Sequence, residues 1–133
     1  LSKRSNQPFK FKNFFIVFNG EIYNFIELKK ELEKVGYKFK TSSDTEVLLY
    51  SYLFWGKRSL QKLEGMFAFA VYDTKNKKIF IARDRFGIKP LFYHLSGEKF
   101  IIASDLEINF SIKFLFVILP LIHLSTSFSM DLS

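Results

Sequence analysis

Asn19 and Gly20 are the residues of this sequence whose types and order point most directly to chemistry. They follow an apolar run, residues 14–18 (FFIVF), and the positive φ that glycine tolerates favours a tight turn after that run. Such a turn presents a side-chain amide and a backbone N–H together, and two donors of this kind hold a developing negative oxygen. The alternative interpretation is a strand-to-helix turn without chemical function.

The composition excludes several other kinds of site. The 133 residues contain no cysteine, so they form no disulfide, no thiolate metal site and no cysteine nucleophile. His94 and His123 are isolated from each other and make no metal-binding spacing. Hydrophobic residues make up 48% of the chain and aromatic residues 19%, which is typical of one folded domain with a sizeable core.

The net charge of +7 does not by itself indicate a nucleic-acid partner. The lysines are scattered or mixed with glutamates, and their longest cluster, residues 75–78 (KNKK), lies where a hairpin turn is expected. A solvated turn explains this cluster better than a nucleic-acid surface does. We therefore expect no nucleic-acid partner.

The sequence also argues against export and membrane insertion. Basic residues interrupt the first twelve positions before any apolar core forms, so we expect no signal peptide. The apolar run at residues 114–122 is broken by Pro120 and falls short of the roughly 17 to 25 residues that a membrane span needs. We expect a cytoplasmic protein with no membrane partner.

Two amphipathic helices are expected to follow the Asn-Gly pair. Asn24 and Glu27 form an N-cap and N3 pair, and Gly36 ends the first helix. Its apolar stripe consists of Phe25, Leu28, Leu32 and Val35. Residues 43–46 (SDTE) form a second capping box, which opens a helix that runs toward Gly56.

Shorter elements are expected around the second helix, and antiparallel strands after it. Alternation predicts a short strand at residues 37–41, and residues 59–63 predict a short helix. The strands expected next are residues 66–72 and 79–82, joined by a hairpin, and then residues 91–95 and 99–103. The first two strands are apolar on both faces, so layers must pack on both sides of their sheet. The fold class is α+β.

Three stretches, taken together, resemble one known family. They are residues 19–24 (NGEIYN), 42–46 (SSDTE) and 83–93 (RDRFGIKPLFY), with residues 63–70 (LEGMFAFA) in between. In order, spacing and wording they resemble the glutaminase domain of glutamine-dependent asparagine synthetases, which is a class II glutamine amidotransferase domain. The resemblance covers residues 1–108; residues 109–133 are an apolar tail of divergent character and unknown role.

The resemblance implies both a fold and an activity. The family's fold is the four-layer αββα sandwich of N-terminal-nucleophile hydrolases, here expected to be incomplete because the first strands are missing. The family hydrolyses glutamine to glutamate and ammonia. The ammonia then passes to a synthetase domain or subunit, where ATP activates aspartate for conversion to asparagine. The implied partners are glutamine and that synthetase part. No cofactor belongs to this chain, since ATP and Mg act in the synthetase domain.

The resemblance also implies roles for particular residues. Asn19 and Gly20 match the oxyanion-hole pair, Glu21 lies in the glutamine-contacting part of the same motif, and Asp44 matches the carboxylate that receives the α-ammonium group. The alternative interpretation of Asp44 is a helix first-turn acid beside a Ser43 cap, and both roles are compatible. A further set of family residues is interpreted as structural: Arg83, Asp84, Arg85, Gly87, Lys89 and Pro90.

The chain departs from the family in three respects. It has no N-terminal cysteine nucleophile, no counterpart of the family's glutamine-binding arginine stretch and no ATP-binding loop. We therefore expect half of a glutamine pocket and no turnover from these residues alone. Two alternatives stay open: another class II amidotransferase, and a non-catalytic module that binds glutamine or regulates a synthetase. The sequence of residues 83–93 favours an asparagine synthetase.

Overall fold

A computed structural model describes residues 8–88, 92–96, 99–103, 115–118 and 130–131, with side chains described through residue 88. The elements follow one another in a mixed order, with the helices between the second and third strands. They are β1 (Phe9–Phe11), β2 (Phe14–Ile22), α1 (Phe25–Lys34), α2 (Asp44–Trp55), the 3-10 turn η1 (Gly56–Arg58), α3 (Ser59–Lys62), β3 (Gly65–Asp73), β4 (Lys78–Arg83), β5 (Phe92–Ser96), β6 (Lys99–Ala103), β7 (Leu115–Ile118) and β8 (Met130–Asp131).

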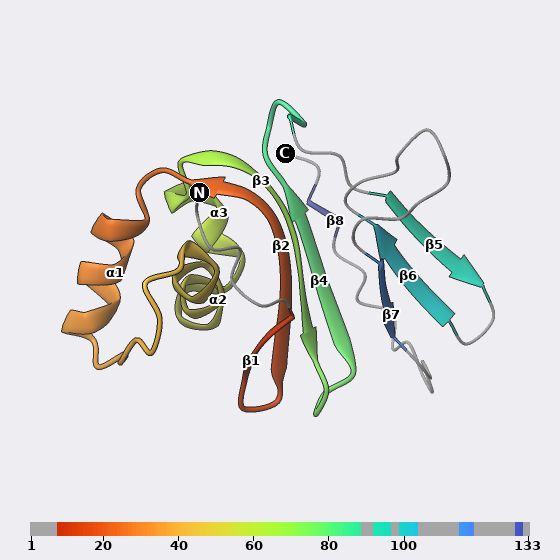
Figure 1. Ribbon diagram of the computed structural model, residues 1–133, viewed down its shortest axis with the longest axis horizontal. Helices are drawn as coiled ribbons and strands as arrows, with labels where there is room; N and C mark the ends of the chain where they lie inside the picture. The colour runs from red at the N-terminus through yellow and green to blue at the C-terminus, as the bar shows by residue number, and fades with distance from the viewer. Residues whose placement is uncertain (1–7, 89–91, 97–98, 104–114, 119–129, 132–133) are drawn as a thin grey trace.

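The strands form two sheets. The first has the order β1-β2-β3-β4-β8, in which β1 to β4 are antiparallel and β8 runs parallel to β4. The second has the order β5-β6-β7 and is antiparallel. Figure 1 shows α1 and α2 on one side of the first sheet and the second sheet on its other side. The described residues thus give a helix layer and two sheet layers, and the α+β prediction is confirmed.

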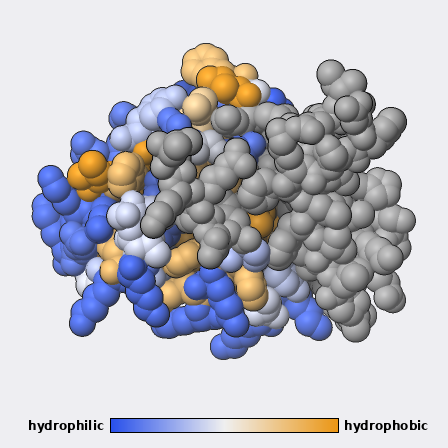
Figure 2. All heavy atoms as spheres, in the orientation of Figure 1, coloured by the Kyte–Doolittle hydropathy of each residue, from blue (hydrophilic) through white to orange (hydrophobic). Residues whose placement is uncertain are grey.

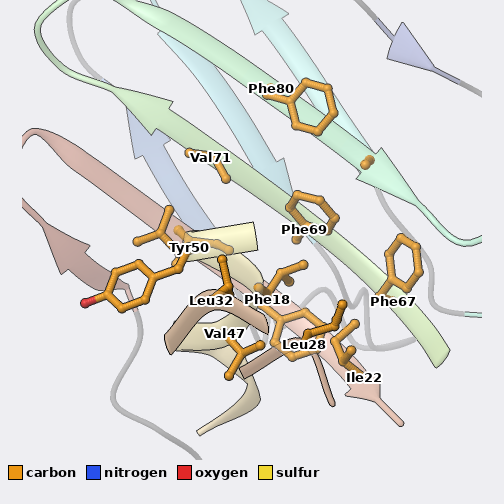
Figure 3. Close-up of a cluster of buried hydrophobic side chains, with 14 residues drawn as sticks. Phe18, Ile22, Leu28, Leu32, Val47, Tyr50, Phe67, Phe69, Val71 and Phe80 are labelled. Carbon is orange, nitrogen blue, oxygen red and sulfur yellow. The ribbon is translucent and has the colours of Figure 1, made fainter. Parts of the chain in front are cut away.

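The hydrophobic core lies between the helices and the first sheet. Alternate residues of β2, among them Ile16, Phe18 and Ile22, face the helices together with neighbours from β3 and β4 (Figure 3). The other core residues are Leu28, Leu32, Val47, Leu48, Leu49, Tyr50, Phe67, Phe69, Val71, Phe80 and Ala82.

The opposite face of the first sheet is also buried. Ala68, Ala70 and Ile81 point away from the helices and are 1%, 4% and 5% exposed. The second sheet lies on that side (Figure 1). The sequence prediction that strands with two apolar faces need a layer on each side is therefore confirmed for β3 and β4.

Helix α1 forms where the sequence predicts it, but its capping residue does something else. Asn24 makes no side-chain cap; its amide donates to Lys62 O at 2.7 Å, and its Oδ1 accepts from Glu64 N at 3.0 Å. These hydrogen bonds to distant residues replace the local cap, and they join the end of β2 to the start of β3. Leu28 and Leu32 are buried as expected, whereas Val35 lies beyond the last helical turn and is 50% exposed.

One expected strand is absent, and one strand forms that was not expected. Residues 37–41 form no strand, because Tyr37 and Phe39 pack on the ring of Tyr50, with centroids 5.0 and 5.1 Å away. Strand β1, in contrast, was not predicted from the sequence; it pairs with the first residues of β2. Lys12 makes this hairpin possible by adopting a positive φ of 53°.

Candidate functional site

Asn19 and Gly20 lie inside β2, and the prediction of a turn at this pair was wrong. The ladder with β3 continues past them, with Asn19 opposite Ala68 and Gly20 opposite Phe67. The preference of Asn-Gly for a turn is local, and nine consecutive residue pairs between β2 and β3 outweigh it. The chain turns only after Ile22, at the residues that lead into α1.

Gly20 is required by its surroundings. Its φ is 138°, and a Cβ at this position would overlap the carbonyl oxygen of Met66 and lie 2.8 Å from the Cα of Phe67. Only glycine permits both this backbone conformation and this close approach of β3. The backbone of β2 is thus bare of side chain at the point where the candidate site lies.

The register also decides which ladder the backbone of Gly20 joins. Phe67, its opposite residue, directs both its backbone groups to the start of the loop after β4: its carbonyl accepts from Asp84 N at 2.8 Å, and its N–H donates to Asp84 Oδ2 at 3.1 Å. Residues opposite each other in an antiparallel pair either exchange both backbone hydrogen bonds or exchange none, so Gly20 and Phe67 form a non-hydrogen-bonded pair. The N–H of Gly20 therefore takes no part in the β2–β3 ladder. Among the described strands, β1 pairs with β2 only at residues 14–16 and does not reach Gly20.

Asp44 is brought to the same end of β2 by the N-terminus of α2. Ser43 caps this helix by accepting from Thr45 N at 3.0 Å, so Asp44 is the first helical residue. The Oδ2 of Asp44 accepts from Ile22 N at 3.2 Å. One hydrogen bond thus joins the helix to the strand two residues beyond Gly20.

The electrostatics around Asp44 favour a cation. Burial raises the pKa of Asp44 and the nearby Glu21 carboxylate adds to this, while hydrogen bonds from the backbone of Ile22, Asp44 and Thr45 lower it. Among the described residues, no lysine or arginine lies within ion-pair distance of Asp44. Within the part of the chain that the structure describes, the ionised form of Asp44 therefore has no positive partner, and a bound ammonium group would supply one.

Glu46 is a buried carboxylate that sequence reasoning assigned to the wrong partner. As the N3 residue of the capping box it was expected to bond back to Ser43, but its side chain turns to the preceding loop. Its carboxylate accepts from Lys40 N at 2.9 Å, Thr41 N at 2.8 Å and Thr41 Oγ1 at 2.7 Å, and from Tyr50 Oη at 3.0 Å. It thereby orders the loop that leads to Asp44.

The loop after β4 is stabilised by two side chains, those of Asp84 and Arg83, which bond to its backbone. Asp84 is 7% exposed, and its Oδ1 accepts from Phe86 N at 3.0 Å and from Ile88 N at 3.3 Å. Arg83 donates from Nη2 to the carbonyl of Gly87 at 2.6 Å. Gly87 lies at a turn with a φ of 59°. Lys89 and Pro90 lie outside the described residues.

The structure therefore brings the four candidate residues to one end of β2. Asn19, Gly20 and Glu21 are consecutive there, and Asp44 reaches the same end through Ile22. Within the described part of the chain, no cluster of three metal-ligating side chains is found. No helix in that part is long and apolar enough to cross a membrane.

Comparison with known proteins identifies the family. Residues 1–113 match the glutamine amidotransferase domain. The chain is 46% identical over 99 residues to asparagine synthetase (glutamine-hydrolysing) 3 of Bacillus subtilis, covering 74% of this chain and 16% of the relative. It is 43% identical over 98 residues to putative asparagine synthetase 2 of Methanocaldococcus jannaschii, covering 74% of this chain and 18% of the relative. The chain thus spans less than a fifth of the length of these relatives.

Solved structures agree on the fold. An allosteric regulatory enzyme of purine biosynthesis superposes with a TM-score of 0.61 and 32% identity, over 74% of this chain and 23% of that one. Glutamine phosphoribosylpyrophosphate amidotransferase of B. subtilis superposes with a TM-score of 0.57 and 24% identity, over 84% of this chain and 31% of that one. Sequence and fold together show that the chain belongs to the class II glutamine amidotransferase domain family, with relatives among the asparagine synthetases.

Proposed function

We propose that this chain is the glutamine-binding part of an asparagine synthetase's glutaminase domain, which supplies ammonia for the ATP-dependent conversion of aspartate to asparagine. Its fold is proposed to be part of the four-layer αββα sandwich. Asn19 and Gly20 form the oxyanion hole, Asp44 receives the α-ammonium group of glutamine, and Glu21 borders the same pocket. The relatives named above are asparagine synthetases that hydrolyse glutamine, which supports this assignment.

The observation that carries the proposal is the hydrogen bond from Ile22 N to Asp44 Oδ2. It fixes the helix N-terminus at a set distance along β2 from Gly20. Two strand residues separate backbone nitrogens by roughly 7 Å, so Asp44 and the Gly20 N–H are spaced like the two ends of a glutamine molecule. The ammonium group of glutamine meets the Asp44 carboxylate, which has no positive partner among the described residues, and the amide oxygen of glutamine meets the two donors.

These 133 residues do not supply the nucleophile that the reaction needs. Amide hydrolysis by this family requires a cysteine nucleophile, and the chain has no cysteine. The four candidate residues bind and orient glutamine and stabilise the tetrahedral oxygen, but they do not attack its amide carbon. The isolated chain is therefore expected to release no ammonia from glutamine.

A hybrid enzyme tests the proposal. In B. subtilis asparagine synthetase 3, the 99 matched residues are replaced by those of this chain, and ammonia release from glutamine is measured. The hybrid should hydrolyse glutamine. Asn19→Ala should lower kcat by about 10²- to 10³-fold, because one oxyanion donor is lost. Asp44→Asn should mainly raise KM for glutamine, by about tenfold or more, because it removes a charge-assisted contact made in the ground state.

Glu27→Gln is the matched control for the Asp44 variant. Glu27 is also a first-turn helix acid, but it is exposed and belongs to α1. This variant should leave kcat and KM unchanged. Glutamine hydrolysis that survives both Asn19→Ala and Asp44→Asn at full rate would refute the site assignment.

A different class II amidotransferase remains the second candidate. The 32% identity to the allosteric regulatory enzyme of purine biosynthesis favours it, but identity to the asparagine synthetases is higher. The hybrid separates the two, since glutamine hydrolysis without asparagine formation would support the second candidate.

A further inference from the structure

The loop formed by residues 84–88, here called the Asp84 loop, is ordered far beyond what a surface connection requires. The carboxylate of Asp84 accepts from three backbone N–H groups, those of Phe67, Phe86 and Ile88, at 3.1, 3.0 and 3.3 Å. The carbonyl of Asp84 also accepts from Gly87 N at 3.0 Å. The backbone of the loop is thus tied to β3 and to itself at nearly every residue.

Arg83 and Gly87 close the loop from outside. The guanidinium donates to the carbonyl of Gly87 at 2.6 Å, and a Cβ at position 87 would lie 2.7 Å from the Arg83 Cζ. Glycine is therefore needed for the guanidinium to lie against the loop. The interaction fixes the loop in one conformation.

This rigid loop presents apolar side chains to solvent. Phe86 is 88% exposed and Ile88 is 58% exposed, the highest and third highest values among the exposed large hydrophobic residues described. Figure 2 shows hydrophobic atoms projecting at the top of the molecule, where Figure 1 draws the turn that follows β4. Arg85, between Asp84 and Phe86, is exposed as well. A preformed loop with an aromatic tip and a flanking arginine has the composition of a binding hot spot.

We infer that the Asp84 loop docks the glutaminase part onto the synthetase part, by inserting Phe86 and Ile88 into an apolar socket edged by carboxylates that pair with Arg85. This inference rests on the proposed function. Two observations select this occupant over others. The relatives that match this chain carry more than four-fifths of their length outside the matched region, and that part must contact this one for ammonia to pass between them.

The position of the loop relative to the candidate site supports the same occupant. Asp84 is bonded through both its backbone N–H and its carboxylate to Phe67, and Phe67 lies opposite Gly20 in the sheet. The Asp84 loop follows β4 and the oxyanion donors lie on β2, so only β3 separates them at this end of the sheet. A partner seated on the loop lies next to the place where ammonia is released.

The test is a binding measurement with the 133-residue chain. The probe is B. subtilis asparagine synthetase 3 without its matched residues, shown beforehand to be folded by its ammonia-dependent formation of asparagine. Binding is followed by interferometry without glutamine, so that its outcome is independent of hydrolysis in the hybrid enzyme. The chain should bind the probe, and Phe86→Ser with Ile88→Ser should weaken binding about tenfold or more. Arg85→Glu should slow association.

Two exposed apolar residues of α1 provide the matched control, because Ile26 and Val35 are 52% and 50% exposed. Ile26→Ser with Val35→Ser should bind like the unaltered chain. Three results would overturn the inference: no binding of the unaltered chain, equal binding of the loop variant, or self-association of the chain that the loop variant abolishes in sedimentation. The last result would assign the loop to a second copy of this chain.

Discussion

Gly20 meets a steric requirement and a chemical one at the same backbone position. The strand β3 passes so close that a side chain would overlap Met66 O, and the register leaves the Gly20 N–H unclaimed by Phe67. The sequence predicted the pair of donors at Asn19 and Gly20 but placed them in a turn. The error has a physical cause, because the turn preference of Asn-Gly is local and the pairing with β3 is set by residues more than forty positions away.

Alanine at position 20 measures the steric part. Gly20→Ala should lower the free energy of unfolding by about 3 kcal/mol, because the new Cβ has no space and the φ of 138° disfavours any side chain. Urea unfolding followed by the fluorescence of Trp55 gives the value. Gly36→Ala is the control, since Gly36 has a φ of 101° but nothing within 4 Å, and it should cost about 1 kcal/mol. Equal losses would contradict the close approach of β3.

Asp44 gives the stability of the chain a pH dependence that is unusual for an aspartate. Its raised pKa means that the folded chain binds the proton more tightly than the unfolded chain, so ionisation of Asp44 lowers the free energy of unfolding. This loss develops as pH rises from the ordinary value of 3.8 through the raised pKa, and it is constant above.

Asp44→Asn isolates this effect, since asparagine keeps an oxygen for Ile22 N–H and carries no charge. The variant should gain stability relative to the unaltered chain as the pH rises through that window. Urea unfolding of both proteins between about pH 3.5 and about pH 7 measures the difference. A difference that stays flat or shrinks with rising pH would show that burial and Glu21 do not disfavour the charge.

At the scale of elements, the helices were predictable and their attachments were not. Periodicity and end signals predicted α1 and α2 close to their observed bounds. Both capping residues that were expected to bond within their helix, Asn24 and Glu46, bond instead to distant or preceding chain. A capping box and a tertiary clasp use the same residue types, so the sequence does not distinguish them.

Glu46 shows how much such an attachment contributes. Burial alone would raise the pKa of Glu46, but hydrogen bonds from Lys40, Thr41 and Tyr50 outweigh it and lower the pKa below 4.5. Glu46→Gln should cost about 2 to 4 kcal/mol at neutral pH, because a fully buried acceptor of four groups is replaced by an amide.

The pH dependence of this variant has the opposite sign to that of Asp44→Asn. The stabilisation by Glu46 is present above pH 4.5 and is lost as pH falls through the lowered pKa, so the gap to Glu46→Gln should close in acid. Chemical unfolding at several pH values measures both the loss and its closure. Glu33→Gln, an exposed change on α1, should alter stability by less than about 0.5 kcal/mol. A gap that widens in acid would contradict the carboxylate's role as acceptor.

At the scale of the whole molecule, the apolar strands account for the layers. The site, in contrast, is brought together by the topology of the chain. Strands apolar on both faces predicted layers on either side of β3, and this requires no knowledge of pairing. The meeting of Asp44 with Ile22 depends on how α2 crosses the sheet, which periodicity does not specify. The family resemblance, and not the pattern of hydrophobic residues, connected residues 19–21 with residue 44 before the structure did so.

Phe69 lies between the helices and the first sheet, so its truncation tests how strongly the packing of these two layers stabilises the molecule. Its ring is 1% exposed and lies with centroids 5.8 Å from that of Phe67 and 6.0 Å from that of Phe80, on the central strand between β2 and β4. Phe69→Ala should therefore lower the free energy of unfolding by about 3 to 5 kcal/mol, through lost burial and a cavity between sheet and helices. Phe54→Ala is the matched control, since Phe54 is 46% exposed on α2, and it should cost about 1 kcal/mol. Urea unfolding followed both by circular dichroism and by Trp55 fluorescence gives these values. Similar losses for the two variants would place the core elsewhere than between the helices and the first sheet.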